Sequence, residues 1–155
     1  MELILWRHAE AEEGELDAPD VGRKLTSKGQ KQAAKMARWL DSNLPETCRI
    51  LVSPAMRTQE TVAHLQRKFK TLPELGLDAS IEDVLSAANW PNSREPVLIV
   101  GHQPYLGLVA AQVLGTPHQE CAVRKGNVWW ITQKLRENEL QTYLKAIMSP
   151  DLVVK

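Results

Sequence analysis

The sequence predicts an α/β fold with three layers, α/β/α, in which helices cover a mostly parallel central sheet that has an antiparallel edge. Three short apolar runs, at residues 3–6, 50–52 and 97–100, are uninterrupted, which is typical of strands buried on both faces. A turn and a helical segment follow each run, and this alternation favours a layered architecture. A chain of 155 residues can build one substantial core, so we expect a single domain over residues 1–155.

The first strand leads into an acidic loop and then into a helix. The loop, residues 10–20, carries six carboxylates and is expected to be solvated. The helix is expected to begin at Thr26 or Ser27, where Ser27 with Gln30 matches a capping box. Pro45 ends this helix, because proline cannot continue it.

The second and third strands are also followed by helix-start signals. Ser53 and Pro54, after residues 50–52, predict the N-cap and the first position of a helix. Pro104 is expected to open another helix after the third strand. Residues 128–132 and 140–146 are expected to pair as a hairpin at one edge of the sheet.

The composition excludes several classes of partner. Lys plus Arg and Asp plus Glu both number 19, so no net charge favours nucleic acid or an anionic membrane surface. The longest apolar run, residues 106–114, contains Gln112 and is too short to span a bilayer. Cys48 and Cys121 form no C-x-x-C pair and indicate ordinary thiols in a reducing compartment. We therefore expect a cytoplasmic monomer that binds neither nucleic acid nor membrane.

Reactive side chains follow all three apolar strands. Arg7 and His8 end the first, Arg57 lies shortly after the second, and His102 follows the third. Ligands of open α/β sheets bind beyond the carboxyl ends of the strands, so these side chains are expected at one edge of the sheet. Guanidinium groups suit a phosphate group, and the helix N-terminus near Arg57 also favours an anion.

This set of residues predicts phosphoryl transfer through a histidine. A neutral imidazole between two arginines can attack phosphorus, because such reactions depend on positioning and charge neutralisation. We expect His8 to be the nucleophile and Arg7 and Arg57 to bind the phosphoryl oxygens. His102 is expected to donate a hydrogen bond to them, as a cation once phosphate is bound. A metal site is the weaker interpretation, because the arginines repel a cation and no third ligand lies nearby in the sequence. No metal and no cofactor are expected.

The chain also resembles the histidine phosphatase superfamily, the phosphoglycerate-mutase-like enzymes. RHA at residues 7–9 resembles the superfamily signature, and three further blocks follow in the expected order: LTSKG at 25–29, SPAMRTQET at 53–61 and VGHQP at 100–104. The short length, the GHQPY form of the last block and the ending MSP at 148–150 are most similar to SixA-type phosphohistidine phosphatases. The resemblance, over residues 2–150, implies a phosphoglycerate-mutase-like fold and metal-free phosphatase activity, with the four residues in the roles given above.

Two departures from the family's pattern concern catalysis. Ala9 stands where the family has glycine after the nucleophile, and its methyl group is tolerated unless the backbone needs a positive φ. Larger relatives protonate the leaving oxygen with a carboxylic acid, for which Glu74 is the best positional candidate, with Asp78 and Glu82 behind it. Imidazole leaves easily from a P–N bond, since its conjugate acid has a pKa of about 6.5. A phosphohistidine substrate therefore needs little acid assistance.

The expected function is removal of phosphate from a phosphohistidine protein through a covalent phosphohistidine on His8. The substrate would be a histidine-phosphotransfer domain or a phosphocarrier, in a signal-transduction or sugar-transport relay. One alternative is a phosphatase of the same superfamily for small phosphomonoesters or for phosphoserine and phosphothreonine. Another is a non-catalytic module that binds phosphoproteins, which would not need a nucleophile. The acidic loop is either a solvated face or a selectivity device that repels small, highly charged phosphates.

Overall fold

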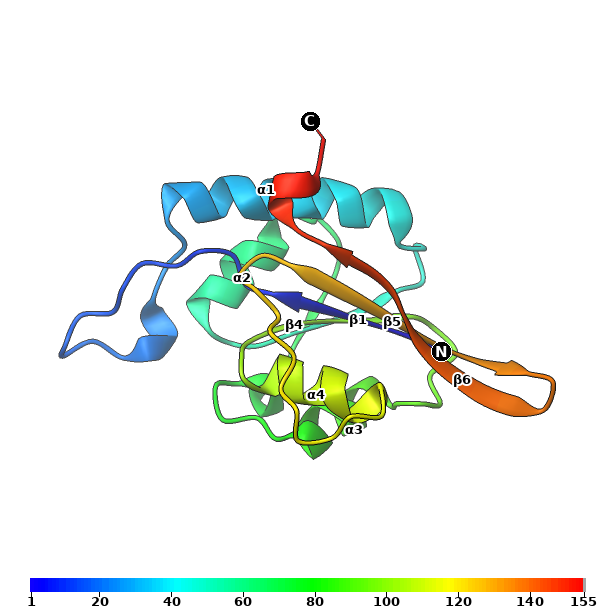
Figure 1. Ribbon diagram of the computed structural model, residues 1–155. Coiled ribbons are helices and arrows are strands. Elements are labelled where there is room, and N and C mark those ends of the chain that lie inside the picture. The colour runs from blue at the N-terminus through cyan, green and yellow to red at the C-terminus, as the bar shows by residue number, and fades with distance from the viewer. Residues whose placement is uncertain (155) are drawn as a thin grey trace.

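Six strands form one sheet in the computed structural model, which describes residues 1–154 (Figure 1). The strand order is β3-β2-β4-β1-β5-β6. Four strands are mutually parallel: β1 (Glu2–Arg7), β2 (Arg49–Val52), β3 (Lys70–Thr71) and β4 (Val97–Gly101). β5 (Val128–Arg136) is antiparallel to β1, and β6 (Glu139–Met148) is antiparallel to β5. The predicted mostly parallel sheet with an antiparallel edge is confirmed.

Helices cover both faces of this sheet, as predicted. α1 (Ser27–Asn43) and α2 (Met56–Ala63) lie on one face, and α3 (Ile81–Ala88) and α4 (Tyr105–Val113) lie on the other (Figure 1). The central strand β1 shows why both layers are needed. Its side chains alternate between two apolar cores: Ile4 and Trp6 pack on the α1 side, and Leu3 and Leu5 pack on the α4 side. All four are fully buried, as an uninterrupted apolar strand requires.

The structure decides how the first helix begins. Thr26 is the N-cap of α1, and its hydroxyl accepts a hydrogen bond from the amide of Gly29 at 2.9 Å. The expected capping box of Ser27 with Gln30 is therefore wrong. Thr26 also donates from its hydroxyl to the carboxylate of Glu10 at 2.7 Å, so the start of α1 is joined to the chain that leaves β1.

The second helix begins later than the sequence predicts. The N-cap of α2 is Ala55 and its first residue is Met56, so Ser53 is not the N-cap and Pro54 is not the first helical residue. The Ser53 hydroxyl instead accepts a hydrogen bond from the amide of Ala55 at 3.2 Å. This turn leaves Ser53 at the carboxyl end of β2, fully buried and facing the ends of the neighbouring strands.

The expected hairpin is present and longer than predicted. β5 and β6 are joined by Glu137 and Asn138, whose φ angles are 52° and 66°, the positive values of a two-residue hairpin turn. Its tip extends away from the helical layers (Figure 1). No helix formed by residues 1–154 is long and apolar enough to cross a membrane.

Candidate active site

The carboxyl ends of β1, β2 and β4 meet and bring the predicted residues together. Arg7 is the last residue of β1 and pairs with Gly101, the last residue of β4. His8 and His102 follow these two strands directly, and the His8 amide donates to the Gly101 carbonyl at 3.2 Å. Arg57 lies in the first turn of α2. We refer to Arg7, His8, Arg57 and His102 as the His/Arg cluster.

His8 presents an unprotonated nitrogen to the cluster. Its Nδ1 lies 2.7 Å from the carbonyl oxygen of Ala9, an acceptor, so Nδ1 carries the proton. Nε2 then holds a lone pair, and Arg57 Nε donates a hydrogen bond to it at 3.3 Å. Burial of the ring lowers the pKa of His8 to about 3, against the opposing effect of the Ala9 hydrogen bond. His8 is therefore neutral at pH 7 and can act as a nucleophile.

Ala9 fits the position where the family has glycine. It is fully buried and is not one of the residues with a positive φ. Its methyl group therefore imposes no backbone strain. Its amide donates to Thr61 Oγ1 at 3.1 Å, and the Thr61 hydroxyl donates to the Arg57 carbonyl at 2.7 Å. Thr61, which the sequence analysis missed, thus joins the loop after His8 to the helix that carries Arg57.

Arg57 is buried and is held by the acidic loop. Its Nη1 donates to the backbone carbonyl of Asp20 at 2.9 Å, and its Nη2 donates to Asp20 Oδ2 at 3.1 Å. A hydrogen bond from Arg23, together with the charge of Arg57, lowers the pKa of Asp20. The loop is therefore not only a solvated face, because one of its carboxylates contacts the cluster. No sequence pattern indicated this residue.

Arg7 is half-buried and incompletely paired. Its Nη1 donates to the Val123 carbonyl at 3.1 Å, while its Nε is buried without a hydrogen-bond partner among residues 1–154. Burial and the positive charge of Arg57 lower the pKa of Arg7, which shows that the two guanidinium groups repel each other. An anion between Arg7 and Arg57 would remove this repulsion.

His102 lies beside His8, with 5.4 Å between the ring centroids. Its Nε2 is 2.7 Å from Ser53 Oγ, and its Nδ1 is buried without a partner in the described part of the chain. Burial, followed by the charge of Arg57, lowers the pKa of His102 to about 4. The ring is thus neutral in the anion-free site, and Ser53 orients it. Ser53 was expected only as a helix cap, although its place after β2 could have indicated this role.

The ring of Tyr105 supports His102 from the other side. The two rings meet edge-on with centroids 5.9 Å apart, and the Tyr105 hydroxyl donates to the Leu75 carbonyl at 2.7 Å. A Cβ atom at Gly101 would lie 2.1 Å from that hydroxyl. The absent side chain of Gly101 therefore makes room for Tyr105.

The carboxylate candidates for a general acid lie outside the cluster. Glu74, Asp78 and Glu82 are exposed, and no hydrogen bond or ion pair joins any of them to the cluster within residues 1–154. Glu74 belongs to a short 3-10 helix, Pro73–Leu75, whose last residue binds Tyr105. The structure therefore brings this segment near His102 without bringing its carboxylate into contact. Among the described residues, no three His, Cys, Asp or Glu side chains are grouped so as to hold a metal ion.

Comparisons with known proteins agree with this geometry. The family model of the histidine phosphatase superfamily (branch 1) matches residues 3–85. The phosphohistidine phosphatase SixA homolog of Haemophilus influenzae is 33% identical over 131 residues, which cover 74% of this chain and 78% of the relative. The phosphohistidine phosphatase SixA of Escherichia coli strain K12 is 30% identical over 122 residues, with 73% and 74% covered.

A solved structure of similar fold extends the comparison to almost the whole chain. The protein histidine phosphatase SixA complexed with tungstate aligns with a TM-score of 0.74 and 26% identity, covering 97% of this chain and 98% of its own. The chain therefore belongs to the histidine phosphatase superfamily, in its SixA-like part. This membership makes it a hydrolase of the phosphatase class.

Proposed function

We propose that the protein removes phosphate from phosphohistidine on a protein substrate, with His8 as the nucleophile. The observation that carries this proposal is the pair of contacts made by His8: Nδ1 lies 2.7 Å from the Ala9 carbonyl oxygen, which can only accept, so Nε2 keeps its lone pair beside Arg57. A buried imidazole with a pKa of about 3 is neutral at pH 7. It needs no general base before it attacks phosphorus.

The reaction proceeds in two displacements. His8 Nε2 attacks the phosphorus, the P–N bond to the substrate imidazole breaks, and the leaving imidazole takes a proton from solvent. Arg7 and Arg57 bind the phosphoryl oxygens, and His102 donates a hydrogen bond to them once the anion raises its pKa. Water then attacks the phosphohistidine on His8, which releases inorganic phosphate and restores the neutral ring. No metal and no cofactor take part in these steps.

Within residues 1–154, no protonated carboxyl group contacts the cluster, which favours phosphohistidine over a phosphomonoester. Asp20 is the carboxylate that contacts the cluster, and its lowered pKa keeps it ionised at neutral pH. An alkoxide leaving group needs a proton from a well-placed acid, whereas imidazole leaves readily because its conjugate acid has a pKa of about 6.5. The names of the SixA relatives, which are phosphohistidine phosphatases, point in the same direction.

The substrate would be a histidine-phosphotransfer domain or a phosphocarrier protein. We further propose that residues 1–155 act as one catalytic domain, as a monomer and in the cytoplasm. We also propose that the protein binds neither nucleic acid nor membrane, because the chain carries no net charge that would favour either.

The decisive experiment compares a phosphohistidine protein with a phosphoserine peptide, in excess chelator, for the wild type and His8→Ala. Fast loss of phosphohistidine alone, abolished in His8→Ala, is the expected result. Faster hydrolysis of phosphoserine would replace the substrate class by phosphomonoesters. Binding of both substrates without hydrolysis would favour a phosphoprotein-binding module. Loss of wild-type activity on adding chelator would contradict the metal-free mechanism.

A further inference from the structure

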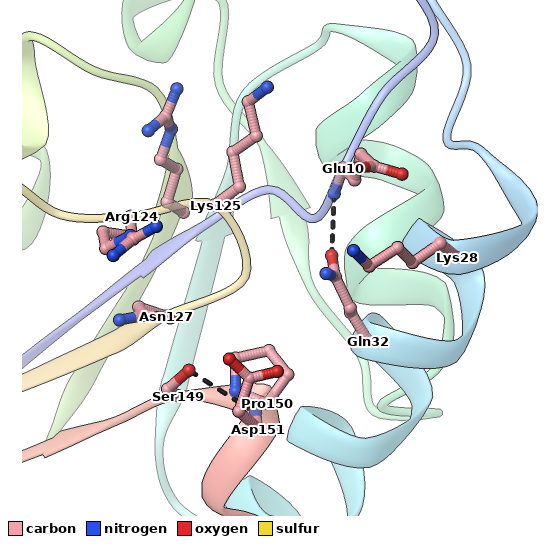
Figure 2. Close-up of a pocket in the computed structure, with 10 residues that line it drawn as sticks. Glu10, Lys28, Gln32, Arg124, Lys125, Asn127, Ser149, Pro150 and Asp151 are labelled. Carbon is pink, nitrogen blue, oxygen red and sulfur yellow. Dashed lines mark hydrogen bonds between the residues drawn. The ribbon is translucent and has the colours of Figure 1, made fainter.

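A polar cavity of about 620 Å³ includes one residue of the His/Arg cluster in its lining, and Figure 2 shows the side chains around this cavity. Four parts of the chain line it: the end of β1 with the loop that follows, the first turns of α1, the loop before β5, and the segment after β6. Arg7 belongs both to this cavity and to the cluster. The cavity therefore adjoins the cluster through Arg7, although the reaction described above does not use the cavity.

The lining of this cavity is predominantly cationic. Its charged residues are Arg7, Lys28, Arg124, Lys125, Glu10 and Asp151. The Glu10 carboxylate is already engaged, because it accepts a hydrogen bond from Thr26. Within residues 1–154, neither Lys28, Arg124 nor Lys125 forms an ion pair. Three cations are thus available to an anionic ligand that reaches the cavity.

The backbone holds the basic pair 124–125 in a fixed place relative to the nucleophile. The amide of Gly126 donates to the carbonyl of His8 at 2.9 Å, and the amide of Arg7 donates to the carbonyl of Asn127 at 3.1 Å. These bonds join the loop before β5 to the end of β1. A ligand bound by the basic pair would therefore lie at a defined distance from His8.

Charges of opposite sign adjoin different arginines of the cluster. Asp20, from the acidic loop, contacts Arg57, whereas the cationic cavity adjoins Arg7. The chain as a whole carries no net charge, so this separation of negative and positive charge is local to the cluster. A protein with carboxylates on one side of its phosphohistidine would be attracted in one orientation and repelled in the opposite one.

We propose that the cavity is a docking subsite for acidic side chains that flank the phosphohistidine of the protein substrate. This inference rests on the proposed function and extends it to substrate recognition. The cavity is much larger than a single phosphate and lies beside, not within, the phosphoryl site. A ligand that fills both must carry a phosphoryl group and separate carboxylates, as an acidic protein segment does.

Two phosphohistidine peptides test this subsite. They have the same length, and three glutamates follow the phosphohistidine in one where three glutamines follow it in the other. At low ionic strength we expect the wild type to favour the acidic peptide about tenfold in kcat/KM, mainly through KM, because several weak exposed pairs act together. Salt should reduce this preference by screening.

Charge-reversal variants locate the effect. Arg124→Glu/Lys125→Glu should abolish the preference for the acidic peptide. Lys134→Glu/Arg136→Glu, on the exposed hairpin, changes the net charge equally and should keep the preference. Arg124→Gln/Lys125→Gln removes the two charges without reversing them and should give an intermediate preference for the acidic peptide. This variant keeps the test valid if the charge-reversed loop misfolds. Hydrolysis of free phosphohistidine should be the same in all four proteins.

The outcomes separate this inference from the proposed function. Equal hydrolysis of both peptides by the wild type would overturn the subsite and leave the proposed function in place. An equal loss of the preference for the acidic peptide in both charge-reversed proteins would have the same meaning. A fall in hydrolysis of free phosphohistidine in the loop variants would mean that these residues act on the phosphoryl group, which also overturns the subsite. If neither peptide is hydrolysed, the proposed function fails. Fluorescence anisotropy with the two labelled peptides then tests the docking subsite separately. Equal affinities for the two peptides contradict the subsite, and tighter binding of the acidic peptide supports it.

Discussion

Asp20 Oδ2 lies 3.1 Å from Arg57 Nη2, and the Asp20 backbone carbonyl lies 2.9 Å from Arg57 Nη1. One residue of the acidic loop thus occupies both terminal nitrogens of an arginine that is 4% exposed. These are the donors that a phosphoryl group would need in the proposed reaction. The loop and the substrate therefore compete for Arg57.

Asp20→Asn should increase the affinity of the site for inorganic phosphate. The substitution removes the charge that competes for Arg57, and an ion pair with one exposed partner is worth roughly 0.2–1 kcal/mol. The inhibition constant of phosphate should fall about twofold to fivefold. Asp17→Asn, in the same loop, removes an equal charge and serves as the control. An unchanged constant in Asp20→Asn would show that the carboxylate does not oppose phosphate binding.

The two buried histidines should make the fold less stable in mild acid. Their pKa values are about 3 for His8 and about 4 for His102, below the value of about 6.5 expected in the unfolded chain. Protonation therefore favours the unfolded state, so stability is complete above pH 6.5 and declines as the pH falls below it. In this range each histidine lowers the free energy of unfolding by about 1.4 kcal/mol for each pH unit of acidification.

Urea unfolding at pH 7.5 and pH 5.5 measures this effect. Between pH 7.5 and pH 5.5, the free energy of unfolding of His8→Gln should fall by about 1 kcal/mol less than that of the wild type. A substitution of the exposed His118 should leave the wild-type fall in stability unchanged. NMR of the ring protons gives a direct check. Titration of His8 with a midpoint near pH 6.5 in the folded protein would contradict the neutral nucleophile.

Ser53→Ala should impair the reaction by releasing His102. The Ser53 hydroxyl is the recorded partner of His102 Nε2 at 2.7 Å, and a displaced catalytic group can lower a rate about a hundredfold. We expect kcat to fall at least tenfold, with a shifted pH profile, because a His102 ring that moves also changes its burial, which is the main cause of its lowered pKa. Ser86→Ala, on the exposed side of α3, is the control. Unchanged kcat and an unchanged pH profile would exclude a positioning role for Ser53.

Tyr105→Phe should destabilise the fold, whereas Tyr143→Phe should not. The Tyr105 hydroxyl is buried and binds the Leu75 carbonyl at 2.7 Å, and a buried carbonyl left without its donor costs about 1–3 kcal/mol. Tyr143 is 41% exposed on β6, so its hydroxyl can be solvated. Thermal unfolding of both variants tests the difference, and equal midpoints would show that water replaces the lost donor.

Glu74→Gln should have little effect on phosphohistidine hydrolysis. Glu74 is exposed and, within residues 1–154, forms no hydrogen bond or ion pair with the cluster. Imidazole also leaves without strong acid assistance. A larger loss on a phosphomonoester is expected, since an alkoxide requires a proton. Parallel kcat/KM measurements on the two substrates would reveal this difference. Equally large losses on both would assign Glu74 a role in each reaction and refute the argument.

The sequence was sufficient to predict the residues that follow the buried strands. Uninterrupted apolar runs identify β1, β2 and β4, and parallel strands bring their carboxyl ends to one edge. His8 and His102 could therefore be placed together without coordinates. Their roles remain predictions, because geometry alone does not measure catalysis.

Contacts made by loops could not be predicted in the same way. Asp20 reaches Arg57 across 37 positions in the chain, and nothing distinguishes it from the other carboxylates of the loop. The Ser-Pro pair at 53–54 is typical of a helix start, but a local sequence pattern does not reveal that Ser53 contacts His102, which lies 49 positions away. The lengths of β5 and β6 were underestimated because the outer strand is largely exposed and lacks a buried periodicity.

The position of β4 determines when the site can come into existence. β4 lies between β1 and β2, yet it follows both in the chain, and its carbonyl groups at Val100 and Gly101 accept the amides of Ser53 and His8. During synthesis, the nucleophile and Arg57 are therefore made before the strand that separates and aligns them. A nascent chain that ends before residue 97 has no scaffold on which to juxtapose them. Activity should appear late in biosynthesis, with the insertion of β4 between β1 and β2.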